Sequence, residues 1–265
     1  MKRALALSLV AGLVALASAC IFPLNWPESD DPGSRGEVFY RVVALEPGGT
    51  VQLENGMGDI EIRGWDRSEV EVSVEEDEGA PFRGRIWLPG GRSTAPRIDV
   101  ESAGNVVKIR TNLPEREREI RSFHFIVNVP RSVNLDGIRG KEGDVTIADL
   151  FGRAQVQIER GRVRVDNFSG SLDLVVGRGS VEAEVLDVRP DDAVTISVAE
   201  GDITLLLAEE AAARLKAAAG GAVTSEFDLG PSAATKNIEA RIGGEPAASI
   251  TLSAPRGSIR LLKSK

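Results

Sequence analysis

Hydrophobic and polar residues alternate along most of the chain from Val38 onward, and small turn residues interrupt this alternation at regular intervals. Five segments share a turn glycine followed by alternating residues, namely residues 143–147, 161–165, 179–183, 201–205 and 221–225. Their first glycines lie 18, 18, 22 and 20 residues apart. A period of this length is typical of stacked repeats, in which each unit buries its apolar side against its neighbours. The pattern therefore predicts an all-β repeat protein.

Turn residues also recur at about half of this period. Gly161, Gly170 and Gly179 separate four consecutive segments, residues 153–160, 162–169, 171–178 and 180–187, and each segment is long enough for one strand. One period would then carry two strands and two corners, as in a β-solenoid or β-helix-like stack with repeats of 18–22 residues.

Alternation along these strands separates a predicted inward set from a predicted outward set. The inward residues are Val163, Val165, Leu172, Leu174, Val181, Val185, Val194, Ile196, Ile203 and Leu205. The outward residues are Arg162, Arg164, Asp173, Glu182, Thr195 and Thr204. An antiparallel β-meander or sandwich fits the same pattern, and only the connectivity of the strands separates it from the solenoid.

Further local signals extend the strand pattern to both ends of the body. Strands are expected at residues 50–54, 58–62, 70–74, 97–100, 106–111, 123–129, 249–253 and 257–262, with a hairpin at 85–88. Asn55-Gly56 is a reverse-turn dipeptide and predicts a turn between the first two of these strands. Good helix formers without β-branched residues predict one or two helical turns within residues 208–219. We expect the last pair of strands to close the stack.

The N-terminus has the organisation of a secretory signal. Lys2 and Arg3 precede an apolar stretch at residues 4–17 and small residues at 17–19. Cys20, the only cysteine, follows at once, and this arrangement resembles the lipobox of bacterial lipoproteins. The resemblance implies that Cys20 is acylated and becomes the first mature residue. Plain secretion and an uncleaved membrane anchor are the alternatives.

The predicted organisation is a signal peptide at residues 1–19, a flexible lipid-anchored tether at 20–37 and the β-repeat body at 38–265. Proline, glycine and acidic residues in the tether bury too little surface to fold. Loss of the leader would remove Lys2 and Arg3 and so change the formal charge from −8 to −10. This acidity argues against nucleic acid as a partner, because phosphate backbones favour basic surfaces.

Candidate chemistry is sparse in this sequence. His124 is the only histidine, so a multi-histidine metal site is excluded and a Ser-His-Asp arrangement would depend on this one residue. Asp59, Asp144 and Asp202 each follow a turn glycine, where calcium binding or paired-carboxylate catalysis competes with simple capping of the turn. Equivalent positions in other repeats hold arginine and serine, which favours capping. Trp65 suits packing over a turn better than stacking on a sugar. We expect no catalytic residue, metal site or cofactor.

Residues 58–67, followed by Val70-Glu71-Val72 and the repeated Gly-Asp-Val or Gly-Asp-Ile, resemble the bacterial DUF4097 family, whose members are named as adhesins of β-helical type. The resemblance covers roughly residues 45–262. It implies an exported β-helical surface protein and supplies no ligand or functional residue.

Three functional hypotheses follow. The first is a non-catalytic, envelope-anchored lipoprotein with an adhesin-like interaction domain, held on the periplasmic or extracellular side through lipid on Cys20, at the outer membrane if the cell is Gram-negative. Its partner would be an envelope protein or a glycan. The second is a structural or stress-linked envelope scaffold. The third is a carbohydrate-active enzyme on a β-helix, which would need acidic residues converging in a groove.

Overall fold

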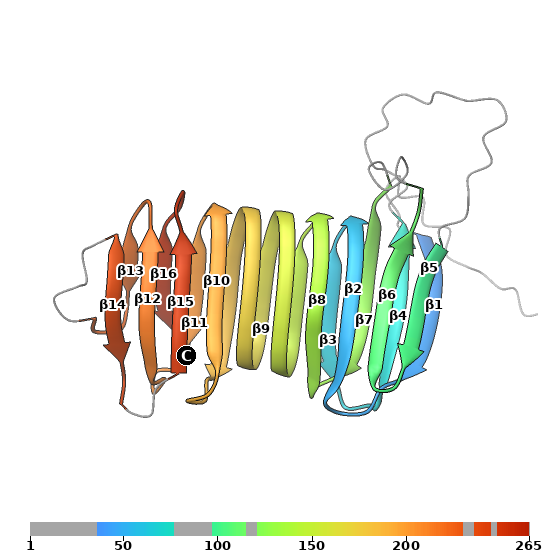
Figure 1. Cartoon of the computed structure of the whole chain (residues 1–265), viewed down its shortest axis with the longest axis horizontal. Coiled ribbons are helices and arrows are strands. Elements are labelled where there is room, and N and C mark those ends of the chain that lie inside the picture. Colours follow the sequence, from blue (N-terminus) through green and yellow to red (C-terminus); the bar gives the residue numbers. More distant parts are fainter. Residues whose placement is uncertain (1–35, 77–96, 115–120, 230–235, 245–247, 265) are drawn as a thin grey trace, which may run out of the picture. The chain divides into compact units, whose positions relative to one another are not determined.

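The computed structural model describes residues 36–76, 97–114, 121–229, 236–244 and 248–264. The chain divides into two units, Met1–Asp31 and Pro32–Lys265, and all described residues belong to the second. Every regular element among them is a β-strand (Figure 1). Within the described ranges, no helix has the length and apolar character needed to cross a membrane. The described part of the protein is therefore all-β.

Sixteen strands of the described residues form one mixed sheet. The first eight are β1 (Gly36–Ala44), β2 (Gly49–Met57), β3 (Ile60–Trp65), β4 (Glu69–Glu76), β5 (Arg97–Ala103), β6 (Val106–Asn112), β7 (Phe123–Pro130) and β8 (Val133–Glu142). The other eight are β9 (Val145–Asp187), β10 (Ala193–Glu200), β11 (Ile203–Leu207), β12 (Ala213–Ala219), β13 (Val223–Ser225), β14 (Asn237–Ile242), β15 (Ala248–Ala254) and β16 (Ile259–Lys263).

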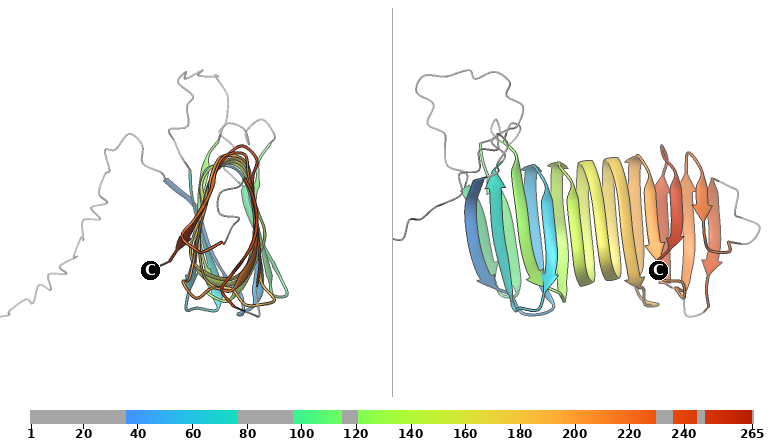
Figure 2. Two further views of the ribbon diagram at one scale, coloured as in Figure 1. Left: turned by 90° about the vertical axis from the view of Figure 1, so that its left-hand side faces the viewer. Right: turned by 180° about the vertical axis from the view of Figure 1, so that it is seen from behind.

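The strands lie in two rows that face each other across a single core (Figure 2). The first row contains β1, β4, β7, β3, parts of β9, β11, β16 and β13, in that order. The second row contains β5, β6, β2, β8, other parts of β9, β10, β15, β12 and β14. The long strand β9 contributes to both rows, because it pairs with β3 and β11 in the first and with β8 and β10 in the second.

Strand direction differs between the middle and the ends of this stack. Interior neighbours are parallel and in register, as in the pairs Val194↔Leu172 and Ile203↔Val181. Among the described strands, antiparallel pairing is confined to β1 with β4, β4 with β7 and β5 with β6 at one end, and β12 with β14 at the other.

The predicted division into inward and outward residues is confirmed. All ten predicted inward residues are buried, including Val165 and Leu174 at 0% exposure. The six predicted outward residues are exposed or half-buried. Full burial of a valine or leucine side chain contributes about 1.5–3 kcal/mol, so the repeated inward positions stabilise the stack along its whole length.

Glycine corners allow successive turns of the chain to approach closely. Gly161 has a φ of 146°, and a Cβ atom there would overlap the carbonyl oxygen of Gly143. Gly179 has the same φ and the same relation to Gly161. A side chain at either corner would meet backbone that has no room to move, which explains why the repeats begin with glycine.

Two local predictions are wrong. Residues 213–219 form strand β12 instead of a helix, because Ala213, Leu215, Ala217 and Ala219 are buried at alternate positions between β14 and β15. Tertiary pairing thus overrides the helix propensity of an alanine-rich segment. The expected turn at Asn55-Gly56 is also absent: β2 continues to Met57, and the Asn55 side chain points inward and donates to the Phe123 carbonyl oxygen at 2.9 Å. The predicted hairpin at 85–88 lies outside the described residues.

Both ends of the stack contain strands inserted out of chain order. Near the N-terminal end, β3 lies between β7 and β9, and β2 lies between β6 and β8. Near the C-terminal end, β15 lies between β10 and β12, and β16 lies between β11 and β13. The expectation that the last pair of strands closes the stack is therefore wrong, since β13 and β14 form that end.

Candidate interaction surface

The turn carboxylates cap the backbone of the neighbouring corner. Asp59 Oδ1 accepts from the Asp144 amide at 2.9 Å, and Asp144 Oδ1 accepts from the Arg162 amide at 2.7 Å. Asp202 Oδ1 accepts from the Ser258 amide at 2.8 Å. These bonds support the capping interpretation of all three aspartates. Within the described ranges, no group of three or more histidine, cysteine, aspartate or glutamate side chains is placed to hold a metal ion.

His124 is half-buried on β7, as expected for a residue opposite the inward phenylalanines. Its side chain is 14% exposed, and its Nδ1 lies 3.7 Å from Asp59 Oδ2. This separation exceeds a hydrogen bond, and Nδ1 has no hydrogen-bond partner among the described residues. The two side chains are neighbours at a corner of the stack.

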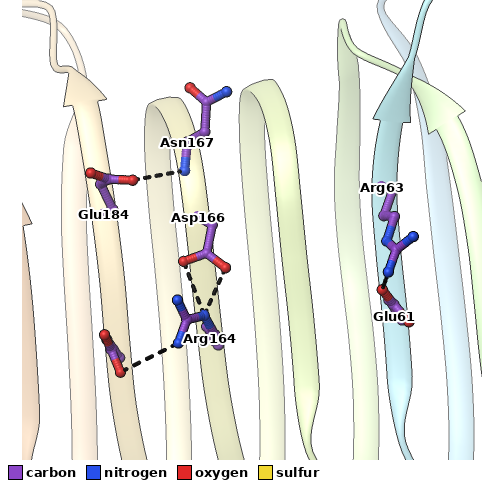
Figure 3. Close-up of polar contacts among 7 residues, drawn as sticks. Glu61, Arg63, Arg164, Asp166, Asn167 and Glu184 are labelled. Carbon is purple, nitrogen blue, oxygen red and sulfur yellow. Dashed lines mark hydrogen bonds and ion pairs between the residues drawn. The ribbon is translucent and has the colours of Figure 1, made fainter.

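A ladder of ion pairs follows the outer surface of the first row (Figure 3). Arg164 Nε donates to Asp166 Oδ2 at 2.7 Å, and its Nη1 lies 3.9 Å from Glu182 Oε2 on the next turn. The hydrogen bond with Asp166, followed by the attraction of its charge, raises the pKa of Arg164. Glu61 and Arg63 form a further ion pair on β3. Thr146 and Ala148 lie opposite Glu61 and Arg63 in the segment between these groups, so the first row carries two separate clusters of opposite charges.

A second ladder lies at the ends of the second-row strands. Glu142 Oε2 lies 2.9 Å from Arg160 Nη2. Further along, Glu200 accepts from Arg178 Nε at 2.7 Å and lies 2.9 Å from Arg256 Nη1. The hydrogen bond from Arg178, then the positive charges of Arg178 and Arg256, lower the pKa of Glu200. This ladder connects the regular middle of the stack to the inserted C-terminal strands.

A groove of about 520 Å³ lies where β6, β2 and β8 end beside the start of β7. Its acidic residues include Glu54, Asp99 and Glu159. Glu54 forms an ion pair with Arg139 at 3.3 Å, and Asp99 accepts from Asn112 at 3.0 Å. Two of the three carboxylates are thus engaged by neighbouring side chains instead of facing each other as a catalytic pair would.

The groove also contains polar groups that sequence reasoning did not single out. Asn55 is 7% exposed, and its Oδ1 and the Thr111 hydroxyl have no hydrogen-bond partner among the described residues. Both residues occupy inward positions at strand ends. The alternation of the strands places both residues at the margin of the core. Because a turn was predicted at Asn55-Gly56, the inward position of Asn55 was not predicted.

Of the remaining candidate residues, Trp65 and Arg162 lie among the described residues and Cys20 does not. Trp65 packs over its turn as predicted: its Nε1 donates to the Glu69 carbonyl oxygen at 2.9 Å, and the Arg67 guanidinium lies 4.6 Å from the ring centre. Arg162 is exposed at its corner. Cys20, the predicted lipidation site, lies outside the described residues.

No protein-family model matches the chain, and no curated protein matches it. Among solved structures, it is similar to a provisionally named cell adhesion protein from Clostridium sporogenes, with 14% identity, a TM-score of 0.46, and coverage of 86% of this chain and 100% of that one. A provisionally named adhesin from Bacteroides fragilis gives 13% identity and a TM-score of 0.31, covering 84% of this chain and 96% of that one. A provisionally named lipid binding protein from Parabacteroides distasonis gives 14% identity and a TM-score of 0.28, covering 86% of this chain and 96% of that one. Similarities this distant carry no conclusion about activity or ligand.

Proposed function

We propose that this protein is an envelope-anchored lipoprotein whose β-repeat body is a non-catalytic, adhesin-like interaction domain of the DUF4097 type. The observation that carries this proposal is the ladder of outward charges on the first row, in which Arg164 links Asp166 to Glu182 on the next turn. These charges lie on the outer face of a continuous sheet. It can meet an extended protein or glycan partner over several strands at once.

The architecture that we propose for the body is a β-solenoid. Parallel neighbours cannot be joined by tight hairpins, so the parallel pairs Val194↔Leu172 and Ile203↔Val181 require the chain to pass through the other row between them. The close approach of Gly161 to Gly143 and of Gly179 to Gly161 supports winding with an 18-residue turn.

The non-catalytic part of the proposal is supported by how the carboxylates are used. Asp59, Asp144 and Asp202 accept hydrogen bonds from backbone amides of adjacent corners. In the groove, Glu54 and Asp99 have side-chain partners. A general acid and base need to face a shared substrate position, and these groups face the protein itself.

We further propose that Cys20 carries the lipid that holds the protein at the cell envelope. The basic residues, apolar stretch and small residues before it form the export signal. Metabolic labelling with radioactive palmitate tests this step. We expect the full chain and a Ser29→Ala control to be labelled, and Cys20→Ser to lose both the label and the tight association with membranes. Unchanged processing and membrane fractionation of Cys20→Ser would exclude acylation.

The interaction function is tested with the purified full chain and an isolated cell-envelope fraction separated into glycan and protein parts. We expect binding to one part that weakens as salt increases, because exposed charges are screened. Arg164→Glu should weaken it, whereas Arg178→Glu, an equivalent change on the opposite row, should leave it nearly unchanged. Release of product from envelope polysaccharides, abolished by Asp144→Asn or Asp202→Asn, would instead identify an enzyme.

A further inference from the structure

Four strands end the two rows within the described residues. Each of β1, β13, β5 and β14 pairs with a single described strand: β4, β16, β6 and β12, respectively. The outer edge of such a strand presents backbone amides and carbonyls that can pair with another strand. Natural sheets commonly protect these edges with charged side chains or by keeping the strand short.

Three of the four edge strands have charged outward side chains or are very short. Strand β5 presents Asp99 and Glu101, and strand β14 presents Glu239 and Arg241. Strand β13 has only three residues. On β5 and β14, charged side chains would be brought close to an incoming strand. On β13, too few backbone groups are present to hold one. These three edges are therefore poor sites for pairing.

The remaining edge, β1, has a register irregularity between Glu37 and Phe39 and an exposed Arg41, but its outward stripe is apolar. Its outward side chains are Val38, Tyr40 and Val42, which are 39%, 56% and 42% exposed. Phe39 and Val43, on the other face of β1, pack on the core and hold the strand in place. The outward apolar side chains are therefore not needed for this packing. Half of the six large hydrophobic side chains exposed among the described residues therefore lie on this single edge strand.

We propose that β1 pairs edge to edge with β1 of a second copy of this chain, in an antiparallel, two-fold arrangement centred on Tyr40. In this register, Tyr40 lies opposite the second copy's Tyr40, and each Val38 lies opposite a Val42. The outward sequence Val-x-Tyr-x-Val reads the same in both directions, so a two-fold pair places apolar side chains of one copy opposite apolar side chains of the other. Aromatic and β-branched side chains opposite each other stabilise antiparallel strands.

The electrostatic surroundings favour this occupant over an anionic lipid surface. Strand β4, next to β1, places Glu71 opposite Val42 and Glu69 opposite Ala44. Tyr40 itself donates to Glu71 Oε2 at 3.0 Å. An anionic membrane would meet these carboxylates directly. In the paired sheet the two β4 strands are separated by three strand spacings of about 4.8 Å each, which exceeds the Debye length of about 8 Å in physiological salt.

Disulfide trapping tests the register of the pair. Residues directly opposite in an antiparallel pair have Cα atoms about 4.5–5.5 Å apart, within the range of about 4.4–6.8 Å that a disulfide needs. In the full chain carrying Cys20→Ser, we expect Tyr40→Cys to form a cross-linked dimer under mild oxidation. Asp99→Cys, on the charged edge β5, and Val175→Cys, an exposed position inside the second row, should not. Cross-linking of Tyr40→Cys no faster than Val175→Cys would overturn the proposal.

Sedimentation equilibrium over a dilution series tests the association without a cross-link. We expect the Cys20→Ser chain to reach twice the monomer mass, and Tyr40→Lys or Val42→Lys to raise the dimer dissociation constant at least tenfold. Unchanged thermal midpoints would show that these exposed substitutions leave the fold intact. Glu101→Lys on β5 is the matched control and should not affect the mass. A chain that stays monomeric overturns the proposal, and so does binding to phosphatidylcholine vesicles that Tyr40→Lys abolishes in a monomeric protein.

Discussion

The middle of the stack and its two ends are built on different rules. In the middle, residues 133–207, segments pair in parallel with segments that follow about one repeat later in the chain, as in the pairs Leu135↔Ala154 and Leu172↔Val194. At the ends, neighbours come from distant parts of the chain: Ile60 pairs with Val145, and Ile203 pairs with Ile259. Antiparallel strands then lie outside these neighbours in both rows at the N-terminal end and in the second row at the C-terminal end.

This difference shows how a repeating sheet is stopped. A parallel stack can add another turn of the same kind at either end, and an uncapped end exposes the apolar core and a pairing edge. Here antiparallel strands end both rows at the N-terminal end and the second row at the C-terminal end, while the first row ends there in β13, a parallel strand of only three residues. At the N-terminal end, Arg41 Nη1 also donates to the Val100 carbonyl oxygen at 3.0 Å and so joins the first strand of one row to the first strand of the other.

The largest expected effect is the loss of unfolding free energy when a buried residue becomes charged, and this loss should be greater in the middle of the stack than at an end. Leu174→Asp places an unpaired charge where exposure is 0% and should cost about 4 kcal/mol of unfolding free energy. Val100→Asp, on β5, should cost about half as much, because an end strand can open locally. Arg164→Asp, on the outer surface, should cost no more than about 1 kcal/mol. Denaturant unfolding of the full chain measures all three, and equal losses would contradict the inward and outward assignment.

A glycine substitution should discriminate the two regions nearly as strongly. Gly161→Ala in the middle introduces a Cβ that overlaps the Gly143 carbonyl oxygen, and we expect a loss of about 3 kcal/mol. Gly104, in the turn between β5 and β6, also has a positive φ, of 60°, but a Cβ there meets no atom within 4 Å. Gly104→Ala should therefore cost only about 1 kcal/mol. Similar thermal unfolding of the two variants would argue against close stacking of the corners.

Hydrogen exchange sharpens the comparison without any mutation. Amides of β9 and β10 lie between paired strands on both sides, whereas β1 and β14 are paired on one side within the described residues. We expect the opening free energy of β1 and β14 to be lower by about 2 kcal/mol. Mass spectrometry of peptides from the exchanged full chain provides the measurement. Uniform protection along the stack would indicate that the ends open only together with the middle.

The smallest effect concerns the ladder that joins the two regions. Arg178 of the middle and Arg256 of the inserted C-terminal segment both lower the pKa of Glu200. Since its pKa is depressed in the folded state, Glu200 adds stability above its unfolded pKa and loses this contribution as pH falls through the folded value. We expect a slight decrease in thermal midpoint on acidification, and less of it in Glu200→Gln. An NMR titration in which Arg178→Ala leaves the pKa of Glu200 unchanged would contradict the assigned cause.

Local pattern was sufficient for the regular part of the fold. Alternation placed Val163, Val165 and Leu174 in the core, and the spacing of Gly143, Gly161 and Gly179 identified the corners. Both signals are short-range consequences of backbone geometry, because side chains alternate along a strand and only glycine allows corners to approach so closely. The capping role of Asp144 likewise followed from its place after a turn glycine.

The tertiary structure decided the features that depend on distant partners. Residues 213–219 are a strand because β14 and β15 pair with them on both sides, although their composition favours a helix. Asn55 lies within a strand, and its side-chain amide Nδ2 donates to the carbonyl oxygen of Phe123, which belongs to a distant segment of the chain. The sequence pattern does not reveal that β15 and β16 are inserted between earlier strands. Any parallel strand with the same alternation of buried and exposed residues could pair with those neighbours. Sequence alone thus determined which side chains are buried in the regular middle of the stack. Long-range pairing determined which strands are adjacent and which edges have no partner among the described residues.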